Sequence, residues 1–254
     1  MAGDDRLILL TQIARTYSLR GWFDEAHRLL DRIEAVLPQS TAPAARVRYH
    51  LERGRSFRSA SQPNLARPHF DLAMTIAQAA GEEALALDAI HMLALTETGD
   101  AALDWNRRGI AAARAAKDPA AQRWALSMLN NLGLALREQG RLAEALAAFE
   151  DNQREAERLQ LPARRDLARW QIARTLREMR RHEEALKIQR QLEAGSAQVD
   201  GFVLEEIAEL LHALGREAEA RPYFARAYTL LSPLPAAQRP SRERLARLRA
   251  LSGP

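Results

Sequence analysis

Cysteine, histidine and glycine motifs are the first places to look for chemistry in this chain of 254 residues. The chain contains no cysteine, which excludes thiolate metal ligands, a thiol nucleophile and a disulfide scaffold. No two of the six histidines have the three- or four-residue spacing that sets two metal ligands on one helical face. The glycines form no phosphate-binding loop, and no serine lies in a nucleophile-elbow motif. We therefore expect no catalytic site, no metal and no cofactor.

Arginine is the side chain best suited here to bind a ligand. Only Lys117 and Lys187 are lysines, so arginine supplies the rest of the 37 basic residues. A guanidinium group binds carboxylates or phosphates in a bidentate geometry. The net charge is only +4, and acidic residues are interspersed with the arginines. A carboxylate-bearing protein partner is therefore favoured over nucleic acid, which would need a strongly basic surface.

Helices must position these side chains. Alanine, leucine, glutamate and arginine are strong helix formers, and β-branched residues are few. A small residue followed by alanine twelve positions later also recurs along the chain. Such pairs allow two antiparallel helices to cross closely. The pairs are Ala14 and Ala26, Gly54 and Ala66, Gly133 and Ala145, Ala173 and Ala185, and Ala208 and Ala220. A weaker unit has Ala102 as its second member and either Ile90 or Ala89 as its first.

This pattern resembles the tetratricopeptide repeat (TPR). The clearest stretch is Leu-Asn-Asn-Leu-Gly at positions 129–133, followed by Gly140, Ala145 and Phe149, and it is similar to the repeats of kinesin light chain. The resemblance implies an all-α fold: a right-handed α-solenoid of six TPR-like helical hairpins with a C-terminal capping helix. We expect a repeat domain over residues 1–233 and a tail with the capping helix over residues 234–254. The expected units are about 5–38, 43–80, 82–117, 119–159, 161–195 and 200–232.

The resemblance also implies a concave groove lined by the first helix of each hairpin. The first member of each pair given above is called its small position. The residue two positions before it is always an amide or a carboxylate: Gln12, Glu52, Asp88, Asn131, Gln171 and Glu206. We call these residues the acceptor row; Asp88 belongs to it if Ile90 is the first small position. Asn131 matches the asparagine that, in kinesin-light-chain repeats, hydrogen-bonds the backbone of an extended peptide. A carboxamide suits that role because it has both a donor and an acceptor.

Arginines one and four residues after the small position are expected to point into the same groove. The candidate peptide-binding residues are therefore Arg15, Glu52, Arg55, Asn130, Asn131, Arg137, Trp170, Arg174 and Arg177. The same arginines could instead pair with carboxylates on neighbouring helices, such as Glu52, Glu138 and Glu178. The sequence favours neither alternative over the other.

These observations predict a non-catalytic adaptor or scaffold that binds an extended, acidic peptide or protein segment. A peptide- or ligand-responsive regulatory TPR protein and an RNA-binding helical repeat are the alternatives. No apolar run approaches the length of a transmembrane helix, and the first residues are acidic, unlike a secretory signal. We therefore expect a cytoplasmic protein with no membrane partner. The arginine bias fits a bacterial genome, and a homodimer through the last repeat face is left open.

Overall fold

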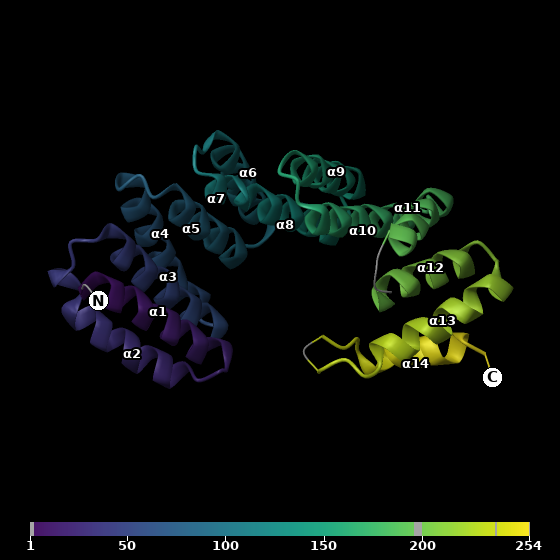
Figure 1. Ribbon diagram of the computed structural model, residues 1–254, viewed down its shortest axis with the longest axis horizontal. Coiled ribbons are helices and arrows are strands. Elements are labelled where there is room, and N and C mark those ends of the chain that lie inside the picture. Colours follow the sequence, from purple (N-terminus) through teal and green to yellow (C-terminus); the bar gives the residue numbers. More distant parts are fainter. Residues whose placement is uncertain (1–2, 196–199, 237, 254) are drawn as a thin grey trace. The chain divides into compact units, whose positions relative to one another are not determined.

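The computed structural model describes residues 3–195, 200–236 and 238–253, and within them the chain forms helices and no strand (Figure 1). The helices are α1 (Gly3–Leu19), α2 (Phe23–Val36), η1 (Leu37–Gln39), α3 (Pro43–Ser59), α4 (Pro63–Ala79), α5 (Glu83–Thr96), α6 (Gly99–Ala115), α7 (Pro119–Gln122), α8 (Trp124–Glu138), α9 (Leu142–Arg158), α10 (Pro162–Glu178), α11 (His182–Gly195), α12 (Gly201–Ala213), α13 (Glu217–Leu231) and α14 (Arg242–Leu251). The prediction of an all-α fold is confirmed.

The helices group into two compact units, Met1–Ala135 and Leu136–Pro254. In the N-terminal unit, α1 packs on α2, α3 on α4 and α5 on α6, and the first helices also contact one another, α1 with α3 and α3 with α5. In the C-terminal unit, α10 packs on α9 and α11, and α12 packs on α11 and α13. Each unit is therefore a stack of TPR-like helical hairpins.

The predicted small residues lie where paired helices approach most closely. Ala14, Ala26, Ala66, Ala145, Ala173, Ala185, Ala208 and Ala220 are fully buried. Gly54 shows the reason most directly, because a Cβ atom there would lie 2.5 Å from the Phe70 ring. Phe70 is itself a fully buried member of the core formed by α3, α4 and α5. Only a residue without a side chain leaves room for that ring.

Seven turns between described helices share one hydrogen-bonded form. At Gly140, the Gly140 amide donates to the Arg137 carbonyl and the Arg141 amide donates to the Leu136 carbonyl, both at 2.9 Å. This pair of bonds is the Schellman motif, which needs a left-handed residue after the helix. The same pair closes the turns at Gly21, Ser61, Gly81, Gln160, Arg180 and Gly215, all with positive φ. Glycine is therefore replaced by serine, glutamine or arginine in three turns of the same geometry.

The C-terminal capping helix is α14, which packs on α13. Its Leu248 is only 1% exposed, and its Arg244 and Arg247 reach Glu205 and Glu209 on α12. The bounds of the repeat domain and of the six units stay a prediction. Residues 1–2, 196–199, 237 and 254, which fall in or between those predicted segments, lie outside the described residues.

Candidate functional site

Within the described ranges, five of the six residues in the acceptor row, all but Gln12, contact a side chain of the preceding hairpin. The members of this row lie on the first helices α1, α3, α5, α8, α10 and α12. Glu52, Gln171 and Glu206 are buried, so each must have a partner to offset the loss of hydration. Each of the three meets an arginine one or four residues after the small position of the preceding hairpin, and Glu52 also meets Arg55 on its own helix.

In the N-terminal unit, Glu52 on α3 collects two arginines. Arg55 Nη1 donates to Glu52 Oε1 at 2.5 Å, and Arg15 Nε on α1 lies 3.8 Å from Glu52 Oε2. The other amino group of Arg55 donates to Asp88 on α5. Burial raises the pKa of Glu52, and the nearby Arg55 and Arg15 act in the opposite direction. Three predicted site residues therefore meet here, and they pair with one another or with Asp88.

Asn130 and Asn131 lie on α8, within the N-terminal unit. Asn131 Nδ2 is 3.4 Å from Nδ1 of His91 on α5, and the His91 ring rests against Trp124 with 5.2 Å between centroids. Burial lowers the pKa of His91, which favours the neutral ring beside this amide. Asn130 Oδ1 is buried with no hydrogen-bond partner in the described part of the chain. The two amides thus differ: one contacts a side chain and the other keeps an unused acceptor.

The remaining predicted arginines gather in the C-terminal unit. Arg137 Nη1 donates to Gln171 Oε1 at 3.0 Å, and Arg137 Nε lies 3.6 Å from Glu178. Arg177 Nε donates to Glu206 Oε2 at 2.9 Å, and Arg174 Nε lies 3.1 Å from Glu206 Oε1. Burial lowers the pKa of Arg137, and the neighbouring Arg174 lowers it further.

Together these contacts form one repeated arrangement, which we call the acceptor ladder. Its rungs are Arg15 to Glu52, Arg55 to Asp88, His91 to Asn131, Arg137 to Gln171, and Arg174 and Arg177 to Glu206. Asp88 takes part in the same way as Glu52 and Glu206, which favours Ile90 over Ala89 as the third small position. The sequence suggested that carboxylates on neighbouring helices could pair with the predicted arginines. Two of those carboxylates do so: Glu52 lies within ion-pair distance of Arg55, and Glu178 lies within ion-pair distance of Arg137. The ladder gives the acceptor row a structural role that needs no ligand.

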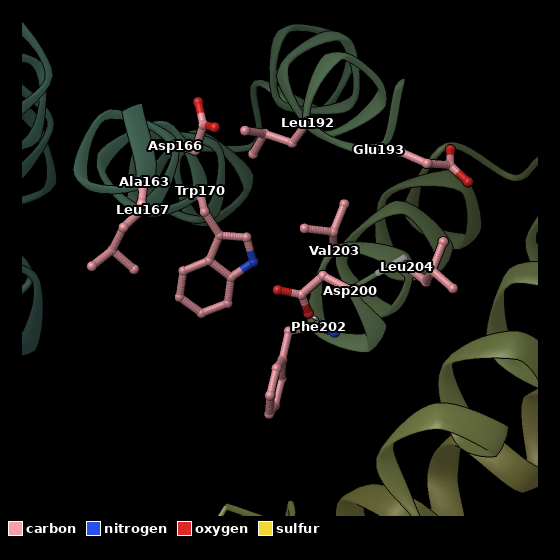
Figure 2. A pocket seen from close by; sticks show the side chains of 10 residues that line it. All are labelled: Ala163, Asp166, Leu167, Trp170, Leu192, Glu193, Asp200, Phe202, Val203 and Leu204. Atoms are coloured by element: carbon pink, nitrogen blue, oxygen red, sulfur yellow. Dashed lines mark hydrogen bonds between the residues drawn. The ribbon is translucent and has the colours of Figure 1, made fainter. Parts of the chain in front are cut away.

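Trp170 has a different environment from the arginines. It lines a pocket of about 380 Å³ in the C-terminal unit, between α10, α11 and α12 (Figure 2). The indole Nε1 is buried and has no hydrogen-bond partner among the described residues. Arg174 lies over the ring, with its guanidinium carbon 4.8 Å from the ring centroid. The other lining residues are Ala163, Asp166, Leu167, Leu192, Glu193, Asp200, Phe202, Val203 and Leu204.

Sequence reasoning found Trp170 but missed the rest of this pocket. Leu167 lies one helical turn before Trp170, so the spacing alone could have found it. Asp200 shows a helix-start signal, since its carboxylate accepts the Phe202 amide at 2.8 Å as the cap of α12. Nothing in the local pattern indicates that Phe202 and Val203 lie opposite Trp170. That arrangement depends on how three helices meet.

No group of three or more histidine, aspartate or glutamate side chains among the described residues could hold a metal ion. None of the helices in that part of the chain is both long and apolar enough to cross a lipid bilayer.

Comparisons with known proteins place this fold. Residues 125–159 match the model of the tetratricopeptide repeat. Among solved structures, apo RapI has a TM-score of 0.78 and 10% identity, over 100% of this chain and 71% of its own. NprR in complex with its cognate peptide NprX has a TM-score of 0.55 and 15% identity, over 99% of this chain and 72% of its own.

A third similar solved structure contains a tetratricopeptide repeat sensor. It is a signal transduction ATPase with a tetratricopeptide repeat sensor from Pyrococcus horikoshii, with a TM-score of 0.63 and 11% identity. The alignment covers 98% of this chain and 35% of that one. No curated protein sequence matches the chain. The chain therefore carries a tetratricopeptide repeat at residues 125–159 and shares the fold of TPR-type helical repeat proteins.

Proposed function

We propose that this chain is a non-catalytic TPR-type protein that binds a peptide or protein segment. One observation carries the proposal: an open, largely apolar pocket beside Trp170, on the face of α10 that the sequence predicted to meet a ligand. Its volume of about 380 Å³ is within the roughly 300–1,000 Å³ range of binding pockets. NprR, which shares the fold and is solved with its cognate peptide, supports the same kind of ligand here.

The biological role proposed for this binding is regulation or the holding of a partner. NprR is described as a quorum sensor, which supports a peptide-responsive regulator. An adaptor or scaffold begins with the same binding step but must hold two partners at once. Sedimentation with one peptide, and then with two labelled partners, separates these roles.

The charge of the ligand is a separate part of the proposal. An acidic ligand is expected because Arg137 on α8 and Arg174 and Arg177 on α10 hold positions that should point into one groove. These arginines already contact Gln171 and Glu206, so an acidic segment has to compete with internal partners. An acidic peptide that binds along the ladder should therefore do so weakly and lose affinity as salt is added. RNA binding faces the same competition at Arg244 and Arg247, which pair with glutamates.

A panning experiment tests the function without a known partner. A phage-displayed library of random 12-residue peptides is selected on the immobilised chain, and enriched sequences are synthesised with a fluorescent label. We expect enriched peptides to bind the parent chain and to bind Trp170→Ala more weakly by fluorescence anisotropy. Trp22→Phe is the matched control, because Trp22 is exposed and lies outside the pocket.

The outcomes are distinct. Enriched peptides that bind the parent and the Trp22→Phe variant equally, and Trp170→Ala more weakly, support the proposal. A library with no sequence enriched over uncoated beads contradicts peptide binding. Tight, salt-dependent capture of a single-stranded RNA of random sequence, with no peptide bound, would replace this function with the RNA alternative.

A further inference from the structure

The Trp170 pocket has a hydrogen-bond donor with nothing to bind. Trp170 Nε1 is removed from solvent but has no acceptor within the described ranges. A buried donor left unpaired costs roughly as much as a lost hydrogen bond, so such groups are uncommon and call for an explanation. Figure 2 shows the indole nitrogen on the ring edge that faces Asp200 and Val203. An acceptor that displaces the atoms covering this nitrogen would pair it, and a peptide carbonyl oxygen is such an acceptor.

The lining of the pocket selects for a large apolar side chain. Leu167 is 40% exposed although it is a large hydrophobic residue, and it lies one helical turn from Trp170. Leu192 and Val203 close the other side, and the Phe202 ring lies beside Asp200 (Figure 2). Covering Leu167 and the Trp170 ring removes apolar surface from water, which contributes roughly in proportion to the area covered.

Three carboxylates line the pocket, those of Asp166, Glu193 and Asp200, and the Arg174 guanidinium lies over the Trp170 ring. Asp166 is paired with Arg165 at 2.8 Å, and Glu193 is paired with Arg226 at 3.3 Å. The Asp200 carboxylate accepts the Phe202 amide, and no cationic side chain of the described residues lies within ion-pair distance of it. This carboxylate caps the N-terminus of α12 but is exposed and has no ion-pair partner among the described residues, so it favours a ligand with a positive charge next to its apolar group.

We propose that this pocket recognises a hydrophobic–basic element of a peptide. A large apolar side chain fills the space between Trp170 and Val203. A carbonyl oxygen of the same peptide accepts the Trp170 Nε1 hydrogen, and an adjacent lysine, arginine or N-terminal amine lies beside Asp200. The inference rests on the proposed peptide-binding function and adds to it the chemistry of the ligand. That chemistry is opposite in charge to the acidic ligand expected from the groove arginines.

The test uses defined peptides and the indole signals of the intact chain. The probe is an acetylated, amidated hexapeptide with adjacent phenylalanine and lysine residues between glycine and serine residues. Two matched peptides replace the lysine with glutamate or the phenylalanine with alanine. Each is titrated into the ¹⁵N-labelled protein. Trp170→Phe identifies the Trp170 indole resonance among those of the four tryptophans.

We expect the phenylalanine–lysine peptide to move the Trp170 indole resonance and to protect its proton from exchange. The two matched peptides should bind more weakly. Asp200→Asn should weaken binding of the lysine peptide about two- to fivefold, the range of an exposed ion pair. Asparagine retains the cap of α12, so the variant should fold. Asp104→Asn, which removes an exposed carboxylate outside the pocket, is the control and should bind as the parent does.

Different results would contradict this inference and the proposed peptide-binding function. Equal binding of the lysine and glutamate peptides, or an unmoved Trp170 resonance, overturns the hydrophobic–basic pocket. Peptides selected from the random library that still bind would then leave the proposed function standing with its site elsewhere. A random library that yields no binding peptide removes the function and this inference together.

Discussion

Glu206 is 2% exposed and lies between the guanidinium groups of Arg174 and Arg177. A carboxylate this deep in the helix stack would be costly without both partners, since desolvation of a charge must be offset by pairing. The acceptor ladder is therefore part of what holds α10 against α12. Its residues cannot be assigned to ligand binding from their type alone, because burial already accounts for them.

The first prediction concerns that carboxylate. Glu206→Gln keeps the shape but removes the charge that two arginines share, so the free energy of unfolding should fall by about 1.5–3 kcal/mol. Urea unfolding followed by circular dichroism measures the change. Glu184→Gln, at an exposed pair with Arg181, should change it far less, because water screens that pair. Equal effects of the two substitutions would show that the ladder does not stabilise the stack.

A second prediction at this scale concerns pH. Burial, helped by the nearby His69, lowers the pKa of His50 to about 4. The two rings meet with their Nδ1 atoms 3.1 Å apart, and Arg53 and Glu34 are the other charged groups that act on His50. An unfolded histidine has a pKa near 6.5, so the unfolded chain binds the proton first as pH falls.

Stability contributed by neutral His50 is therefore present above about pH 6.5 and lost as the pH falls toward 4. The melting temperature should decline across that window, and His50→Gln should make the decline shallower. His27, His69 and His91 shift in the same direction, so some slope should remain. A melting temperature that rises on acidification across this range would contradict the burial of these rings.

At the scale of the helices, the turns differ in whether the residue with positive φ is a glycine. Gly140 has φ of 73°, and a Cβ atom there would meet nothing within 4 Å. Any loss on substitution thus comes from the backbone and not from a clash. Gly140→Ala should lower the free energy of unfolding by about 1–2 kcal/mol, the cost of the left-handed conformation. Gly195→Ala, also in open space but without positive φ, should have little effect in the same urea titration.

Helix packing gives a further prediction at this scale. Gly54→Ala places a methyl group against the buried Phe70 ring, so α3 and α4 should be forced apart at a cost of about 1–3 kcal/mol. Phe70→Leu removes the clashing ring atoms but also loses core volume. In the double variant, the second substitution should cost less than it does alone. Additive losses in thermal unfolding would mean that the two residues do not meet.

Much of this element-level structure could be predicted from the sequence. The small residues and helical periodicity identified the hairpins because close crossings depend on local spacing. The acceptor row was also visible, but its partners were not, since a rung joins residues some 30 to 40 positions apart through the packing of successive helices. Arg53 illustrates the limit. It directly precedes Gly54, at a position where the repeat pattern predicts an apolar core residue. The arginine is nevertheless buried, because its side chain contacts Tyr49, His27 and Asp31.

For the whole molecule, the C-terminal end depends on α14. Without it, Leu248 no longer covers α13, and the buried Glu205 loses Arg244. Terminal repeats of helical stacks need such a cap because their outer face otherwise meets water. A chain that ends at residue 240 should therefore melt at a lower temperature and lose hydrogen-exchange protection in α12 and α13 first. Unchanged protection there, measured by mass spectrometry, would show that α14 is dispensable.

The acceptor ladder also bears on how an array of this kind can lengthen. Helix α3 contributes one residue to each of two rungs. Its Glu52 meets Arg15 of the preceding hairpin, and its Arg55 meets Asp88 of the following hairpin. A tandem duplication of α3 and α4 would therefore bring the Arg55 of one copy to the Glu52 of the next. No charge of the ladder would be stranded, so the ladder itself would need no compensating substitution at the new junction.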